Sequence, residues 1–149
     1  MKLSNVLKVS AVLWAIWGVF HLFIGVASAV LFIKGHPVGQ FEAFPEVMNI
    51  TMFNMQSPFA PIATLVQHSY NLAWAGLIVT IGSIYVWKQS KTAIFLSALI
   101  GGLFDLGYFV FVDLGGYASF PGPQMTYICA SAIVLSFYAY FKSDKLANI

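Results

Sequence analysis

The sequence has few charges and no arginine. Only 8% of its 149 residues are charged, whereas 60% are apolar, and the mean hydropathy is +0.84. So few charged side chains cannot cover a water-facing surface, which excludes an ordinary soluble domain and indicates that lipid is the main solvent. The absence of arginine also disfavours a site built on bidentate capture of phosphate or carboxylate groups.

Cysteine and the common catalytic motifs are equally scarce. Cys129 is the only cysteine, so no disulfide can form within the chain. The sequence contains no glycine-rich phosphate loop, no cysteine pair and no His-Glu-x-x-His motif. Ser69 and Ser131 lie in apolar segments, and no neighbouring pattern marks either of them as a nucleophile. No established catalytic signature is therefore present.

Four long apolar segments make up most of the chain, at residues 9–33, 62–87, 92–112 and 123–141. Each comes close to or exceeds the roughly 20 residues that a helix needs to cross a hydrocarbon core of about 30 Å. The first segment is too long for a signal-peptide core and has no small-residue cleavage site before Lys34, so we interpret it as a retained helix. We predict an all-α membrane protein with one domain, residues 1–149, folded as an up-down bundle of four transmembrane helices.

The lysines sort to one side of this bundle. Six of the seven fall on the side of the two termini, and only Lys34 falls on the other. The positive-inside rule then places both termini in the cytoplasm of a multi-pass protein of the cell membrane. We call the side of the termini inner and the opposite side outer. The net charge of +2 is thus a topology signal, and no nucleic-acid partner is expected.

The only long connection, residues 34–61, lies on the outer side. Within it "EVMNITMFNMQ", residues 46–56, has the apolar spacing of a short helix lying on the membrane surface. An alternative interpretation takes Met48, Met52 and Met55, with His36 nearby, as soft ligands for Cu(I). The surface helix is the simpler of the two, because methionine is also a common apolar filler.

Polar residues inside the apolar segments mark candidate sites. An ionisable group near the bilayer centre costs about 2.5–3.5 kcal/mol on insertion scales. Asp105 lies eight residues inside the outer boundary at Asp113, which is about 12 Å deep at the rise of an α-helix. Tyr108 shares its helix face. Asp113 itself is expected to be a solvated helix end.

The second segment carries a polar stripe at a matching depth. His68, Asn71 and Trp74 recur every three residues and therefore share one helix face. Counted from residue 62, His68 and Asn71 lie roughly 9–14 Å deep, at the level of Asp105. On the first segment Trp17 and His21 share a face, with His21 nearer the midplane. The predicted ligand-binding residues are His68, Asn71, Asp105, Tyr108, His21 and Trp74.

Each of these groups also has a purely structural interpretation. A histidine or asparagine in a membrane often only hydrogen-bonds a neighbouring helix, and Asp105 would then be a protonated carboxyl bonded to a carbonyl. The deep tryptophans, Trp14, Trp17 and Trp74, are better explained as packed core than as the wall of a pocket. The glycines of the first segment, Gly18 and Gly25, are expected to let helix backbones approach, together with Gly101 and Gly102 of the third.

The plan of the chain resembles a known class of small membrane proteins. The early "WGVFHLFIG", a second span that opens on a polar motif, and about 150 residues in four spans are similar to DoxX-like and related small bacterial membrane proteins. This resemblance covers the general plan and no specific motif, so no functional residue is carried over. Some members have been linked to quinone-dependent redox chemistry, and the resemblance therefore implies a redox role as one expectation.

Three functions fit these observations. The first is a binding or transport protein with an outward-open pocket for a small molecule, lipid, proton or metal ion. The second is an enzyme in which His21 or His68 acts as a general base or as a metal or haem ligand and Asp105 is its partner. A depth difference of roughly 9 Å between the two histidines disfavours a bis-histidine haem site. The third is a homo-oligomer or an accessory subunit of a larger membrane complex, in which the polar residues only pack helices. The sequence identifies no cofactor.

Overall fold

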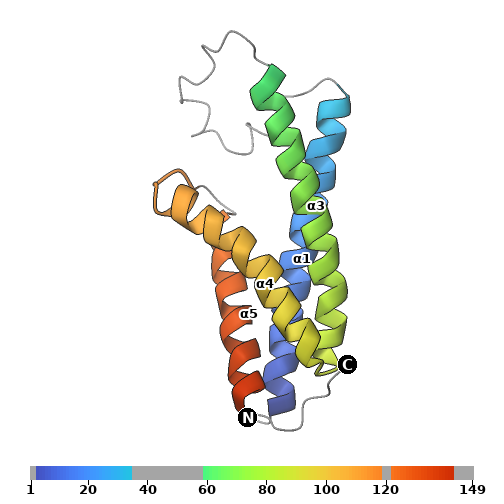
Figure 1. The fold of residues 1–149 in the computed structure, drawn as a ribbon, viewed down its shortest axis with the longest axis vertical. Helices are drawn as coiled ribbons and strands as arrows, with labels where there is room; N and C mark the ends of the chain where they lie inside the picture. The colour runs from blue at the N-terminus through green and yellow to red at the C-terminus, as the bar shows by residue number, and fades with distance from the viewer. Residues whose placement is uncertain (1–2, 35–58, 119–121, 143–149) are drawn as a thin grey trace.

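The computed structural model describes residues 3–34, 59–118 and 122–142 and folds them into four long antiparallel helices (Figure 1). The elements are α1 (Leu3–Ile33), α3 (Phe59–Trp87), α4 (Lys91–Tyr108) with its π-helical continuation η3 (Phe109–Asp113), and α5 (Gly122–Lys142). The described part of the chain contains no β-strand. The predicted all-α up-down fold is confirmed, and the helices begin or end within a few residues of the predicted spans.

The helices have the length and surface of membrane spans. All four are long and apolar enough to cross a bilayer. Large apolar side chains lie on the outside of the bundle, where Phe23, Phe111 and Phe141 are 70%, 76% and 78% exposed. Such surfaces are compatible with lipid and indicate a multi-pass membrane protein. The side on which the termini lie stays a prediction from the lysines.

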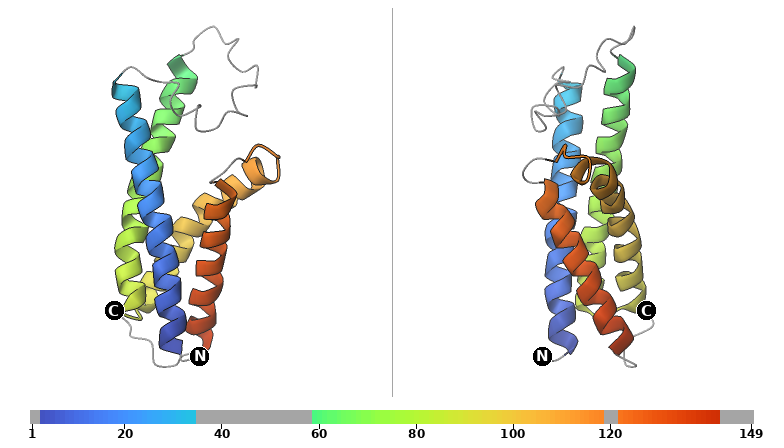
Figure 2. Two further views of the ribbon diagram at one scale, coloured as in Figure 1. Left: turned by 180° about the vertical axis from the view of Figure 1, so that it is seen from behind. Right: turned by 90° about the vertical axis from the view of Figure 1, so that its left-hand side faces the viewer.

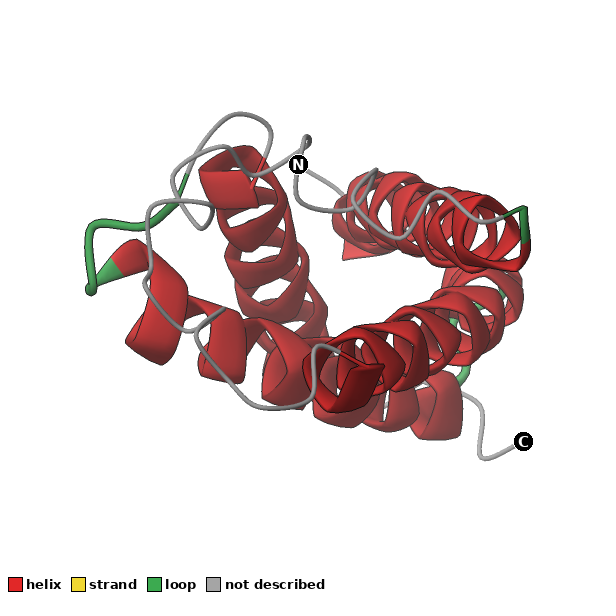
Figure 3. Cartoon of the chain, turned by 90° about the horizontal axis from the view of Figure 1, so that it is seen from above, coloured by secondary structure: helices red, strands yellow, loops and turns green. Residues whose placement is uncertain are grey.

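The four helices pack in the cyclic order α1, α3, α4, α5. Helix α1 contacts α3 and α5, and α4 contacts the same two helices from the opposite side, as the view along the bundle shows (Figure 3). The start of α1 and the end of α5 lie at the same end of the bundle (Figure 1). At the outer end, α1 and α3 extend past the other two helices, and α4 leans away from them (Figure 2). The outer ends of the helices are therefore not level with one another.

Glycines allow α1 and α3 to cross at very short range. A Cβ atom added to Gly76 of α3 would overlap the backbone nitrogen of Leu22, and one added to Gly25 of α1 would lie 2.5 Å from the backbone nitrogen of Ala73. Gly18 likewise faces Thr80 and Gly76. The close approach expected for Gly18 and Gly25 is thus confirmed, with α3 as the partner helix.

The glycines of α4 have a different role. A Cβ atom added to Gly101 would lie 2.6 Å from the ring of Trp14, and one added to Gly102 would lie 3.1 Å from the side chain of Ile133. Gly101 therefore makes room for an aromatic ring of α1. The expectation that it brings two backbones together is wrong, because the bulky Trp14 side chain occupies the space between α1 and α4.

Two tryptophans occupy the centre of the bundle. Trp14 and Trp17 have no exposed surface, and their rings meet edge to face with 6.4 Å between centroids. This confirms that they are core residues. Trp74 is 37% exposed and meets Phe104 of α4 edge to face, with 5.9 Å between ring centroids, so the core interpretation is wrong for that residue. The expected surface helix and the Met48, Met52, Met55 and His36 group lie outside the described residues.

Candidate functional site

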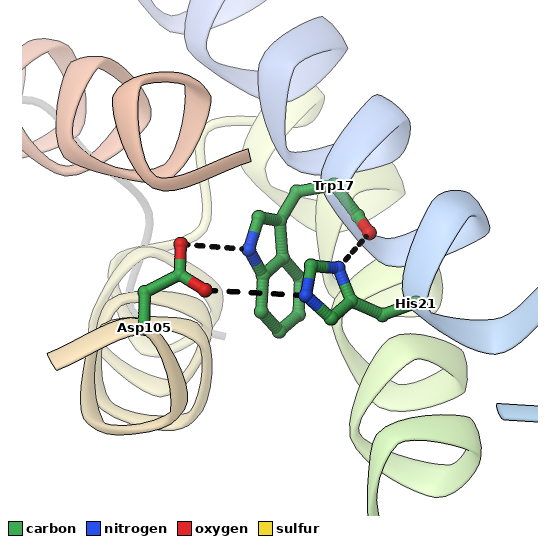
Figure 4. A network of polar contacts seen from close by, with 3 residues as sticks. All are labelled: Trp17, His21 and Asp105. Carbon is green, nitrogen blue, oxygen red and sulfur yellow. Dashed lines mark hydrogen bonds and ion pairs between the residues drawn. The ribbon is translucent and has the colours of Figure 1, made fainter. Parts of the chain in front are cut away.

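The carboxyl group of Asp105 is buried where α4 meets α1 and α5. Only 7% of the residue is exposed. The indole Nε1 of Trp17, on α1, donates a hydrogen bond of 2.9 Å to Oδ2 (Figure 4). The thiol of Cys129, on α5, is also hydrogen-bonded to this carboxyl. Asp105 thus ties three helices together through two donors that the sequence provides at separate points of the chain.

His21 completes a compact cluster with Trp17 and Asp105. Its Nε2 lies 3.9 Å from Oδ1 of Asp105, and its Nδ1 lies 2.8 Å from the backbone oxygen of Trp17 (Figure 4). The imidazole stacks on the indole, with 3.9 Å between ring centroids and 23° between planes. Four residues apart, Trp17 and His21 share one face of α1. We call these three residues the Trp17–His21–Asp105 cluster.

The hydrogen bonds of the cluster determine which atoms of His21 and Asp105 can carry a proton. A backbone carbonyl only accepts, so Nδ1 of His21 must carry hydrogen when it bonds to Trp17. The nitrogen that faces Asp105 is therefore Nε2, with either a lone pair or a second N–H. Oδ2 of Asp105 already accepts from Trp17, which leaves Oδ1 to face His21.

One proton between these two atoms leaves the pair without net charge. A neutral imidazole beside a protonated carboxyl and an imidazolium beside a carboxylate have the same total charge. Either form avoids the cost of an unpaired charge in an apolar bundle. The 3.9 Å separation of Nε2 and Oδ1 is that of an ion pair and longer than a hydrogen bond of about 2.7–3.2 Å. A side-chain movement of about 1 Å would bring the two atoms into proton-transfer range.

A second polar cluster lies on the inner side of the first. Ser10 donates to the backbone oxygen of Ala132 at 2.9 Å, and its Oγ is 2.5 Å from Oγ of Ser136. Nε1 of Trp14 donates to Ser136 at 3.1 Å. Since the Ser10 hydrogen is used by Ala132, Ser136 donates to Ser10 and accepts from Trp14. All of these side-chain donors have partners, so the cluster binds α1 to α5 and matches the structural interpretation of membrane polar residues.

The other predicted site residues lie elsewhere in the structure. Asn71 accepts a hydrogen bond of 3.1 Å from Nε1 of Trp74, so these two residues pair along α3 itself. His68 is exposed on α3, and its charge acts on His21. Tyr108 lies at the outer end of α4 with its hydroxyl against Gly122 of α5. Of the six predicted residues, the structure brings Asp105 and His21 together, and a ligand-binding role for the other four stays a prediction.

Trp17 is the site residue that the sequence interpretation missed. The sequence predicts Trp17 on the same helix face as His21, but only as a core residue. A buried indole N–H requires an acceptor, and that requirement could have identified Trp17 as a partner for a buried carboxyl. Depths counted from one common outer plane put His68, and not His21, at the level of Asp105. Helices α1 and α3 extend past α4 (Figure 1), so His21 reaches the level of Asp105.

The described residues provide no metal-ligand set. Within residues 3–34, 59–118 and 122–142, no three His, Cys, Asp or Glu side chains are placed to hold one metal ion. An open hollow on the surface of α1 is apolar and includes none of the predicted site residues; it is lined by Ala15, Ile16, Val19, Phe20 and Phe23. The chemistry that the geometry offers is therefore that of a buried acid and base.

Comparisons with known proteins find no relative of this chain. No protein-family model, no curated protein and no solved structure matches this chain. The resemblance to DoxX-like proteins therefore stays an expectation from the plan of the chain.

Proposed function

We propose that this membrane protein binds a proton at the Asp105–His21 pair, as the proton-binding element of a binding or transport protein. The observation that carries the proposal is the approach of His21 Nε2 to Asp105 Oδ1, at 3.9 Å, inside an apolar bundle. The pair needs one proton to be neutral, and no other charged side chain is paired with it in the described part of the chain.

The surroundings support a proton as the bound species. Trp17 and Cys129 supply hydrogen bonds to the carboxyl from α1 and α5. The imidazole is held by its stack on Trp17 and by its Nδ1 contact. Both groups are therefore oriented before a proton arrives. Such preorganisation is what a group that gains and loses protons requires, because little rearrangement accompanies each step.

A structural role is the second candidate. The fully paired Ser10–Trp14–Ser136 cluster shows that buried polar groups of this bundle can serve packing alone. If Asp105 had the same role, it would hold one protonation state at every pH at which the bundle is folded. The two functions therefore differ in a property that can be measured directly.

Infrared difference spectroscopy of the protein in lipid, recorded between alkaline and acidic pH, tests the proposal. We expect the C=O band of a protonated carboxyl to appear on acidification and to be missing in Asp105→Asn. The substitution keeps an oxygen acceptor for Trp17 but removes the ionisable group. The matched control is Asp113→Asn, which should keep the Asp105 band. If Asp105→Asn leaves the difference spectrum unchanged, Asp105 does not titrate and the proposal is wrong.

A further inference from the structure

Two side-chain oxygens between Asp105 and the outer end are buried without a chain partner. They are Oδ1 of Asp113 and Oγ1 of Thr126, neither of which has a hydrogen-bond partner among the described residues. A buried polar atom of this kind is costly unless water or an ion satisfies it. The expectation that Asp113 is simply a solvated helix end is wrong for this oxygen, because neighbouring side chains and backbone cover it.

Contacts between α4 and α5 place Thr126 on the route between Asp105 and the outer end. On α5, Gly122 lies against the hydroxyl of Tyr108, and Cys129 is hydrogen-bonded to Asp105. Thr126 is four residues after Gly122 and three before Cys129, so it shares their helix face. The seam between α4 and α5 therefore carries polar side chains from Asp105 outward, with Thr126 in the interval.

Asp113 ends this seam on the outer side. It is the last residue of η3, whose wider turns are seen in the 2.9 Å hydrogen bond from Leu114 N to Phe109 O, five residues back. Single π-helical turns are frequent at functional sites. The helix dipole disfavours a carboxylate at a C-terminal end, so helix stability does not explain Asp113. Its charge acts on Asp105, which lies eight residues earlier in the chain.

Two tryptophan rings lie between Asp105 and the inner serine cluster. Trp14 and Trp17 have no exposed surface and separate Asp105 from the Ser10–Ser136 pair. An indole N–H can donate a hydrogen bond but cannot accept a proton and pass it on. Protons therefore have no relay through these two rings, whereas the seam between α4 and α5 carries the two buried oxygens named above.

We propose that waters held by Asp113 and Thr126 carry protons between the outer surface and Asp105. Asp113 exchanges the proton with bulk water, Thr126 holds the connecting water, and each hop moves one proton with no net change in the relay. This inference depends on the proposed proton-binding function. It adds that protons reach Asp105 from the outer side, along the seam between α4 and α5. The groups that face or electrostatically act on the pair are Cys129 from α5, Asp113 from its own helix, and His68 from α3.

A pH jump with rapid-mixing infrared detection tests the path. Protein in detergent is mixed into acidic buffer, and the Asp105 carboxyl band is followed in time. In Thr126→Val and in Asp113→Asn we expect the band to rise about a hundredfold more slowly than in the unsubstituted protein, the lower end of what a positioned proton carrier contributes. The final amplitude should be unchanged, because neither residue belongs to the Asp105–His21 pair.

Controls separate this inference from the proposed function. Thr92→Val removes the same hydroxyl at an exposed position of α4 and should leave the rate unchanged, and Asp113→Glu should restore it. Thr126→Val removes a hydroxyl that has no hydrogen-bond partner among the described residues, so the bundle should fold, as helical circular dichroism would verify. A normal rate in either Thr126→Val or Asp113→Asn overturns the path while the equilibrium band still supports proton binding. A band that is missing from the unsubstituted protein overturns the proposed function itself.

Discussion

Replacing Trp17 with alanine is expected to lower the free energy of unfolding by about 3–5 kcal/mol, the range for removing a large buried aromatic side chain. Trp17 has no exposed surface and contacts the rings of Trp14 and His21. Its loss would leave a cavity at the centre of the bundle, and helices in lipid depend on such van der Waals contacts. Denaturant titration in mixed detergent micelles measures the change.

Two further variants show whether the hydrogen bond and the burial of Trp17 account for the expected loss of stability. Trp17→Phe keeps most of the ring but removes the N–H that donates to Asp105, so we expect a cost of about 1–3 kcal/mol for the unsatisfied carboxyl. Trp74→Ala is the matched control, because Trp74 is 37% exposed and should lose much less. An equal cost for Trp17→Ala and Trp74→Ala would contradict the assignment of Trp17 to the core of the site.

Gly76→Ala is expected to destabilise the bundle by about 2–3 kcal/mol, the upper part of the range for overpacking. The added methyl group would overlap the backbone of Leu22 and approach the carbonyl oxygen of Gly18 at 2.5 Å. Neither of these is the flexible end of a side chain, so α1 and α3 must move apart to accept it. The same denaturant titration applies.

Gly107→Ala is the matched control for this prediction. Gly107 lies in α4, and an added Cβ would meet nothing within 4 Å. Alanine has the higher helix propensity, by up to about 1 kcal/mol, so this variant should be neutral or slightly stabilising. If both glycine variants behave alike, the short-range crossing of α1 and α3 does not contribute to stability in the way that the structure indicates.

Composition and hydropathy were sufficient to predict the fold. The four apolar runs correspond to the four helices because a span of about 20 apolar residues has few alternatives to a helix in lipid. The short turn predicted at Lys88 to Lys91 also matches the structure, where α3 ends at Trp87 and α4 begins at Lys91. Ser90 caps α4 by accepting a hydrogen bond of 3.3 Å from the backbone nitrogen of Ala93. These features depend on residues that are close together in the sequence, so the sequence alone predicts them.

The partners of Asp105 were harder to predict because they depend on how the helices tilt and slide. Asp105 itself stood out as an acid within an apolar run. Its contact with His21 requires α1 to extend past α4, and the position of Cys129 requires the register of α5 against α4. Neither the relative height of two helices nor their register is encoded in the spacing of residues within one of them. The role of Trp17 followed only from its hydrogen bond.

Nitrogen-15 NMR of His21 in lipid bilayers tests the shared-proton site most directly. The structure predicts that Nδ1 carries hydrogen at every pH, because it bonds to the backbone oxygen of Trp17. The resonance of Nε2 should change with pH together with the Asp105 carboxyl carbon, and Asp105→Asn should abolish that joint change. A bare Nδ1, or an Nε2 resonance that responds in the same way in the unsubstituted protein and in Asp105→Asn, would contradict a proton shared between Asp105 and His21.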